Sequence, residues 1–96
     1  MAIGEFRSDL EKIIKDLTSS GFKSIDSGTV EKLKKISAAS EEMNLNEGKR
    51  LIDNLVGAME AIKEGKSGAE SGDVRLMALD FYIKKLGDGG LSTEEL

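Results

Sequence analysis

The sequence contains no cysteine, histidine, proline or tryptophan, and aromatic residues make up only 4% of its 96 residues. Without cysteine no disulfide can form, and without cysteine and histidine the usual zinc ligands and the Ser-His and Cys-His nucleophile pairs are missing. Neither GxGxxG nor GxxxxGK[ST] occurs, because Gly48-Lys49-Arg50, the closest segment, lacks the first glycine and the hydroxyl. The sequence therefore predicts no enzyme activity, no cofactor and no metal site.

Long apolar runs and an excess of basic residues are also missing. No segment approaches the roughly 18 consecutive apolar residues of a membrane span, and the first residues lack the apolar region of a secretory signal. The formal net charge is -4, whereas general nucleic-acid binding relies on clustered lysine and arginine. These absences predict a cytoplasmic protein without membrane contact. They point to no small-molecule substrate.

Aliphatic residues recur at helical spacing along most of the chain. The chain is long enough for one domain with one modest core. The longest such segment is 45–62, where apolar residues three and four apart lie on one side of a helix. Its apolar positions are Leu45, Leu51, Ile52, Leu55, Val56, Met59 and Ile62. This pattern predicts a central helix with one face in the core.

A second stripe of small residues lies beside that face, at Asn54, Gly57, Ala58 and Ala61. Gly57 and Ala61 are four residues apart, so another helix could approach closely there. Charged neighbours exclude the membrane setting in which this spacing marks a dimer. We expect ordinary packing within the chain at this stripe, rather than a dedicated interface. Asn54 is expected to be a hydrogen-bonded amide that sets helix register, with a ligand contact as the alternative.

Three further helices are expected around the central one. Apolar residues from Ile3 to Leu17 form a narrow seam that ends at Gly21, and a weaker pattern covers 29–43. A break near Asn44, with Asn44 as N-cap and Glu47 three residues later, separates this helix from the central one. The alternative is one continuous helix over 29–64.

The central helix is expected to end at Gly65. A polar loop over 66–72 precedes a last helix that opens at Ser71 or Asp73 and ends at Gly87. Phe22 is expected to cover one end of the bundle, together with Ile25. The predicted fold is a single all-α domain over residues 1–96, a small up-and-down bundle of four helices without a sheet.

The last helix is apolar on two sides. Leu76, Leu79, Ile83 and Leu86 form one face, and Val74, Met77, Ala78, Phe81 and Tyr82 occupy most of the rest. The second set is either buried by the first helix and the Phe22 turn or covered by another chain. Aromatic residues and methionine concentrate at interface cores, so this second set is the candidate interface.

The function expected from these patterns is a non-enzymatic protein-interaction module that self-associates through the last helix as a homo-oligomer. An adaptor or chaperone-like binder could use the same face for a different partner, receiving its helix in an apolar groove. A weak nucleic-acid binder would instead use Lys32, Lys34 and Lys35. Glu31 beside these lysines, and the lack of interleaved aromatic residues, favour a solvated helix face there.

The chain ends with DGGLSTEEL, which resembles the second half of an EF-hand calcium loop at Asp88, Gly89, Leu91, Ser92 and Glu95. The same register puts Lys84 and Leu86 at the first and third ligand positions, where neither can coordinate calcium. Ser92 and Glu95 instead form a capping box. We therefore expect a frayed turn or the start of a further helix, and no metal site.

Overall fold

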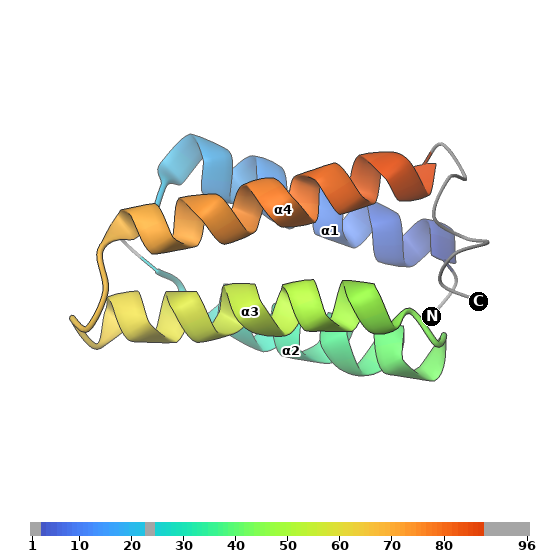
Figure 1. Cartoon of the computed structure of the whole chain (residues 1–96), viewed down its shortest axis with the longest axis horizontal. Helices are drawn as coiled ribbons and strands as arrows, with labels where there is room; N and C mark the ends of the chain where they lie inside the picture. Colours follow the sequence, from blue (N-terminus) through green and yellow to red (C-terminus); the bar gives the residue numbers. More distant parts are fainter. Residues whose placement is uncertain (1–2, 23–24, 88–96) are drawn as a thin grey trace.

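The computed structural model describes residues 3–22 and 25–87, and it contains the four expected helices (Figure 1). Their bounds are α1 Ile3–Ser20, α2 Ser27–Glu42, α3 Asn46–Lys63 and α4 Ala69–Gly87. Each helix runs antiparallel to the one before it, and the described residues contain no strand. The predicted all-α, up-and-down bundle is confirmed.

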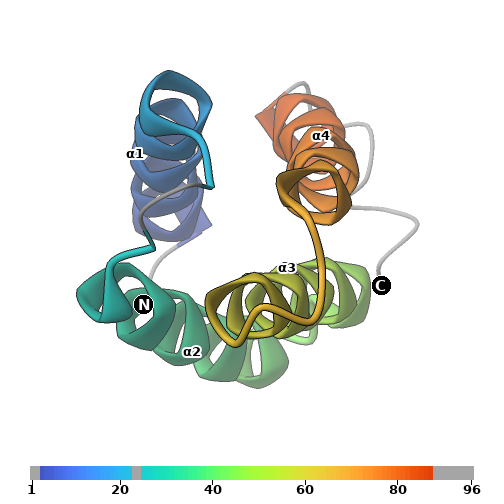
Figure 2. The ribbon, with the colours of Figure 1, turned by 90° about the vertical axis from the view of Figure 1, so that its left-hand side faces the viewer.

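The helices lie in two layers, with α1 beside α4 and α2 beside α3 (Figure 2). Helices that are adjacent in the chain are adjacent in space, and α4 closes the ring against α1. Among neighbouring helices, packing is most extensive between α2 and α3 and between α3 and α4, and least extensive between α1 and α2. Short links favour this arrangement because each helix must turn back beside its predecessor.

The core lies where the four apolar stripes meet along the axis of the bundle. Residues of all four helices contribute side chains that are almost fully buried, among them Phe6, Leu10, Leu33, Ile52, Leu55, Met59, Leu79 and Ile83. Leu51 and Ile62, at the edge of the α3 stripe, are only partly buried. No described helix is long and apolar enough to cross a membrane.

Phe22 is buried, as expected, and its ring packs on α4 at Gly72. A Cβ on Gly72 would lie 2.9 Å from three carbons of that ring, so only glycine fits without a shift. The polar loop predicted over 66–72 is therefore too long, because α4 already begins at Ala69. Contact with Phe22 stabilises a first helical turn whose Gly- and Ser-rich composition does not predict a helix.

Local capping groups close the C-terminus of α1 and the N-terminus of α2. Gly21 adopts φ +72°, and its N–H donates to the Leu17 carbonyl at 2.7 Å. Asp26 caps α2 by accepting a hydrogen bond from the Gly28 N–H at 3.0 Å. Gly21 is thus the predicted C-terminal signal of α1, and Asp26 supplies the N-cap of α2.

The break between α2 and α3 is where it was expected, but Asn44 is not the N-cap. Asn44 lies in the turn with φ +62°, a left-handed conformation that asparagine tolerates better than most residues. Leu45 is the N-cap residue, and it makes no side-chain capping bond because leucine has no hydrogen-bond acceptor; its side chain is instead buried in the core. The single helix over 29–64 is excluded.

A polar contact joins α2 to α3. The buried Ser37 hydroxyl donates to Asp53 Oδ1 at 2.5 Å, and the Lys49 ammonium donates to Oδ2 at 2.7 Å. The fully buried Ser40 donates its hydroxyl to the Ser37 carbonyl. Small serine side chains allow the two helices to pack tightly. The weak apolar pattern of α2 did not predict that these two serines would be buried.

Candidate interaction surface on α4

Helix α4 has a buried face and an exposed apolar face. Leu76, Leu79, Ile83 and Leu86 point into the core, as predicted. On the other side, Val74 is 65% exposed, Met77 72% and Phe81 61%, and these are the large hydrophobic side chains that stand out among the described residues. Ala78 beside them is also exposed. We call Val74, Met77, Ala78 and Phe81 the outer stripe of α4.

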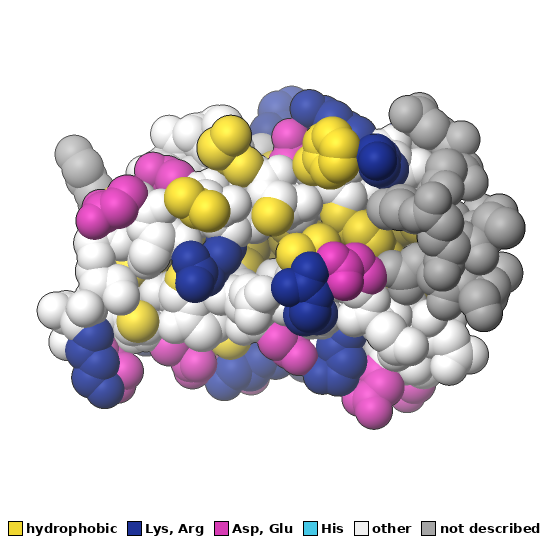
Figure 3. Space-filling view, in the orientation of Figure 1, with side chains coloured by type: hydrophobic (Ala, Val, Ile, Leu, Met, Phe, Trp, Pro, Cys, Tyr) yellow, Lys and Arg dark blue, Asp and Glu magenta, His cyan; other side chains and the backbone are white. Residues whose placement is uncertain are grey.

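The outer stripe exists because the other sides of α4 are already occupied. Val74, Met77 and Phe81 are spaced three and four residues apart, so they line up along the helix. α1 and α3 pack on the remaining flanks. In the view of Figure 3, hydrophobic side chains lie exposed over the length of α4. Among the described residues, no helix packs across the outer stripe.

Tyr82 does not belong to the exposed surface, contrary to the prediction. It is only 3% exposed and packs over Gly48 of α3. A Cβ on Gly48 would lie 2.9 Å from the Tyr82 hydroxyl oxygen and 3.1 Å from two ring carbons. Tyr82 is three residues after Leu79 and four before Leu86, so it lies on the flank that faces α3. The missing side chain at Gly48 makes room for the ring.

The small residues of α3 were also misassigned. Gly57 and Asn54 are exposed, and nothing lies within 4 Å of a Cβ placed on Gly57. Only Ala58 of this stripe is buried. Asn54 is thus not a buried amide that sets register, because its side chain is exposed. Together with Ser71 and Arg75 of α4, these residues border a shallow depression between the two helices.

Charged residues at the two ends of α4 differ in sign. Glu70 and Asp73 are exposed in its first turns, and Lys84 and Lys85 are exposed in its last turn. Lys84 forms an ion pair with Asp80 at 3.0 Å, and the Lys85 ammonium lies 4.8 Å from the centroid of the Phe81 ring. This order of charges complements the helix dipole. It also leaves the outer stripe with one acidic and one basic end.

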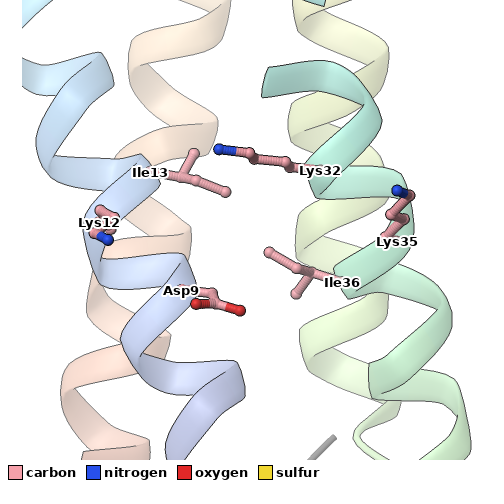
Figure 4. Close-up of a pocket in the computed structure, with 6 residues that line it drawn as sticks. All are labelled: Asp9, Lys12, Ile13, Lys32, Lys35 and Ile36. Carbon is pink, nitrogen blue, oxygen red and sulfur yellow. The ribbon is translucent and has the colours of Figure 1, made fainter. Parts of the chain in front are cut away.

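The lysine cluster of α2 is divided between two sides of the helix. Lys34 forms ion pairs with Glu60 of α3 at 3.5 Å and with Glu31 at 4.0 Å. Lys32 and Lys35 instead line a groove between α1 and α2 (Figure 4). The other lining residues are Asp9, Lys12, Ile13 and Ile36, which include no aromatic side chain for base stacking. Lys12 had not been predicted to join the cluster, because it comes from a distant part of the sequence.

Two acidic side chains in the first half of α3 form ion pairs on the surface. Glu47 pairs with Arg50, whose hydrogen bond lowers the pKa of the Glu47 carboxyl and raises that of the guanidinium. Desolvation acts to raise the pKa of Asp53, but hydrogen bonds from Lys49 and Ser37 and the lysine charge lower it overall. Within 3–22 and 25–87 no three acidic side chains come close enough to hold a metal ion. Of these two carboxylates, Glu47 pairs within α3, whereas Asp53 also connects α3 to Ser37 of α2.

The EF-hand-like tail over 88–96 lies outside the described residues. Comparison of the chain with models of protein families, with curated protein sequences and with solved structures gives no match.

Proposed function

We propose that this chain is a non-enzymatic helical interaction module that associates with a second copy of itself through the outer stripe of α4. The observation that carries the proposal is the exposure of Val74, Met77 and Phe81 along one line of a helix whose opposite face is fully buried. Single exposed apolar side chains are common on protein surfaces, but three large ones aligned on one helix are more than scattered exposure explains. Such a patch is typical of a surface that another protein covers.

The composition of the stripe also supports a protein partner. Phenylalanine and methionine are enriched in the cores of interfaces, and flexible methionine adapts to an irregular opposing surface. A helix stripe is self-complementary under two-fold symmetry, which is the commonest arrangement of homo-oligomers. The absence of cysteine and histidine supports a non-enzymatic role, and the cytoplasmic location expected from the sequence is part of the proposal.

Light scattering over a range of protein concentrations tests this function. We expect the wild-type chain to form dimers at tens of micromolar, and Phe81→Glu to give a folded monomer because a charge would be buried in the interface. Leu79→Glu is the matched control, since Leu79 lies on the buried face of the same helix. That variant should lose several kcal/mol of stability and its helical circular dichroism signal.

A wild-type chain that stays monomeric at these concentrations would contradict self-association. Loss of folding in Phe81→Glu would show that Phe81 belongs to the core, against its 61% exposure. A monomer that binds a foreign amphipathic helix through the same stripe would support the adaptor alternative instead.

A further inference from the structure

We infer that the second copy binds with its α4 antiparallel to the first, and that charges at the ends of the outer stripe select this orientation. The inference rests on the proposed self-association and specifies its geometry. Its basis is the order of side chains along the exposed line of α4. That line begins with Glu70, continues through Val74, Met77 and Phe81, and ends at Lys84 and Lys85.

The end charges are available for a partner. Glu70, Asp73 and Lys85 are exposed and take part in no ion pair among the described residues. An antiparallel arrangement sets the acidic end of one helix beside the basic end of the other. A parallel arrangement would instead place the Glu70 residues of the two copies beside each other, and likewise the two Lys85 residues. Like charges placed in this way disfavour the parallel dimer, as they do in coiled coils.

The apolar residues between these ends fit the same orientation. A two-fold axis beside Met77 and Ala78 places Val74 opposite the partner's Phe81, because both lie the same distance from the axis along the helix. The same axis places Glu70 opposite the partner's Lys85, whose ammonium lies over Phe81 within its own chain. The large ring then meets the smaller valine, and Met77 meets the partner's Ala78. Each pair of facing residues across the axis therefore combines side chains of complementary size or charge.

Single cysteines provide a direct test, because the natural chain has none. Ala78→Cys lies beside the proposed axis and should form a disulfide-linked dimer on mild oxidation. Lys85→Cys alone should not crosslink, since the two copies of position 85 lie at opposite ends of the dimer. A mixture of Glu70→Cys and Lys85→Cys should crosslink as a heterodimer. Ala38→Cys, at an exposed position on α2, is the matched control and should stay monomeric under the same conditions.

Each outcome separates the orientation from the function it rests on. A dimer that crosslinks through Ala78→Cys and also through Lys85→Cys alone would overturn the antiparallel arrangement and leave self-association through α4 intact. Crosslinking at Ala78→Cys without any product in the Glu70→Cys and Lys85→Cys mixture would also overturn it. Absence of every crosslink, with monomers in light scattering, would overturn the proposed function itself. Far-ultraviolet circular dichroism of each variant confirms that the compared chains are folded.

Discussion

Small residues set how closely the helices of this bundle approach one another. Gly48 accommodates the Tyr82 ring, and Gly72 accommodates the Phe22 ring, each at a distance where a Cβ would collide. Both aromatic rings are buried, so neither can swing away into solvent. At the residue scale, two glycines therefore determine where two of the chain's few aromatic side chains pack.

Gly48→Ala is expected to destabilise the fold by about 1 to 3 kcal/mol, because the new Cβ forces the buried Tyr82 ring to move. Gly57→Ala on the same helix is the control. With nothing within 4 Å of its Cβ, it should raise stability by about 0.5 to 1 kcal/mol through the higher helix propensity of alanine. Urea denaturation followed by circular dichroism measures both changes. Equal effects of the two substitutions would contradict the close contact between Gly48 and Tyr82.

At the scale of helices, the contact of α2 with α3 depends on polar groups as well as on the core. α2 has a narrow apolar stripe, and its buried Ser37 and Ser40 take positions where larger residues would separate the helices. Asp53 of α3 accepts hydrogen bonds from Ser37 and from Lys49. The contact therefore couples the packing of two helices to the ionisation of one carboxyl group.

This coupling predicts a dependence of stability on pH. The pKa of Asp53 in the folded chain is lower than its ordinary value of 3.8, so the ionised carboxylate stabilises the fold. That contribution is complete above the unfolded pKa and is lost as the pH falls through the folded value. Asp53→Asn should therefore be less stable than wild type at neutral pH and nearly equal to it at strongly acidic pH. Thermal melts at both pH values test this, and a constant difference between the two chains would contradict it.

At the scale of the whole molecule, charge is distributed unevenly around the ring of helices. α4 carries an exposed apolar stripe with opposite charges at its ends, and the groove between α1 and α2 is bordered by three lysines and one aspartate. The stripe combines apolar area with charge complementarity, whereas the groove combines positive charge with two isoleucines. These differences make the α4 surface the better candidate for self-association.

Charge reversal at one end of α4 should weaken the dimer, and a second reversal at the other end should restore its affinity. Glu70→Lys should weaken it roughly tenfold, because two symmetric pairs with the partner's Lys85 change from attraction to repulsion. Adding Lys85→Glu to the same chain should restore affinity, and high salt should reduce the difference by screening. Sedimentation equilibrium measures the dissociation constants. A double variant weaker than either single variant would contradict the antiparallel pairing of these ends.

The sequence by itself determined the fold class, the number of helices and most of their ends. Apolar spacing of three and four residues specifies a helix and its buried face, and Gly21 and Asp26 provide local capping signals. These features depend on neighbours within a few residues along the chain. The sequence also marked Val74, Met77, Ala78, Phe81 and Tyr82 as a second apolar side of the last helix, but it left open whether this side is buried or exposed.

Only the tertiary structure decided which flank of each helix meets a neighbour. Tyr82 is buried because Gly48, more than thirty positions away in the sequence, lacks a side chain, and α4 starts early because Phe22 packs on Gly72. Gly57 and Asn54 are exposed at the edge of the contact between α3 and α4, beside the shallow depression that Ser71 and Arg75 also border. Helical periodicity places residues around a helix axis, but it carries no information about where the neighbouring helices lie around that axis.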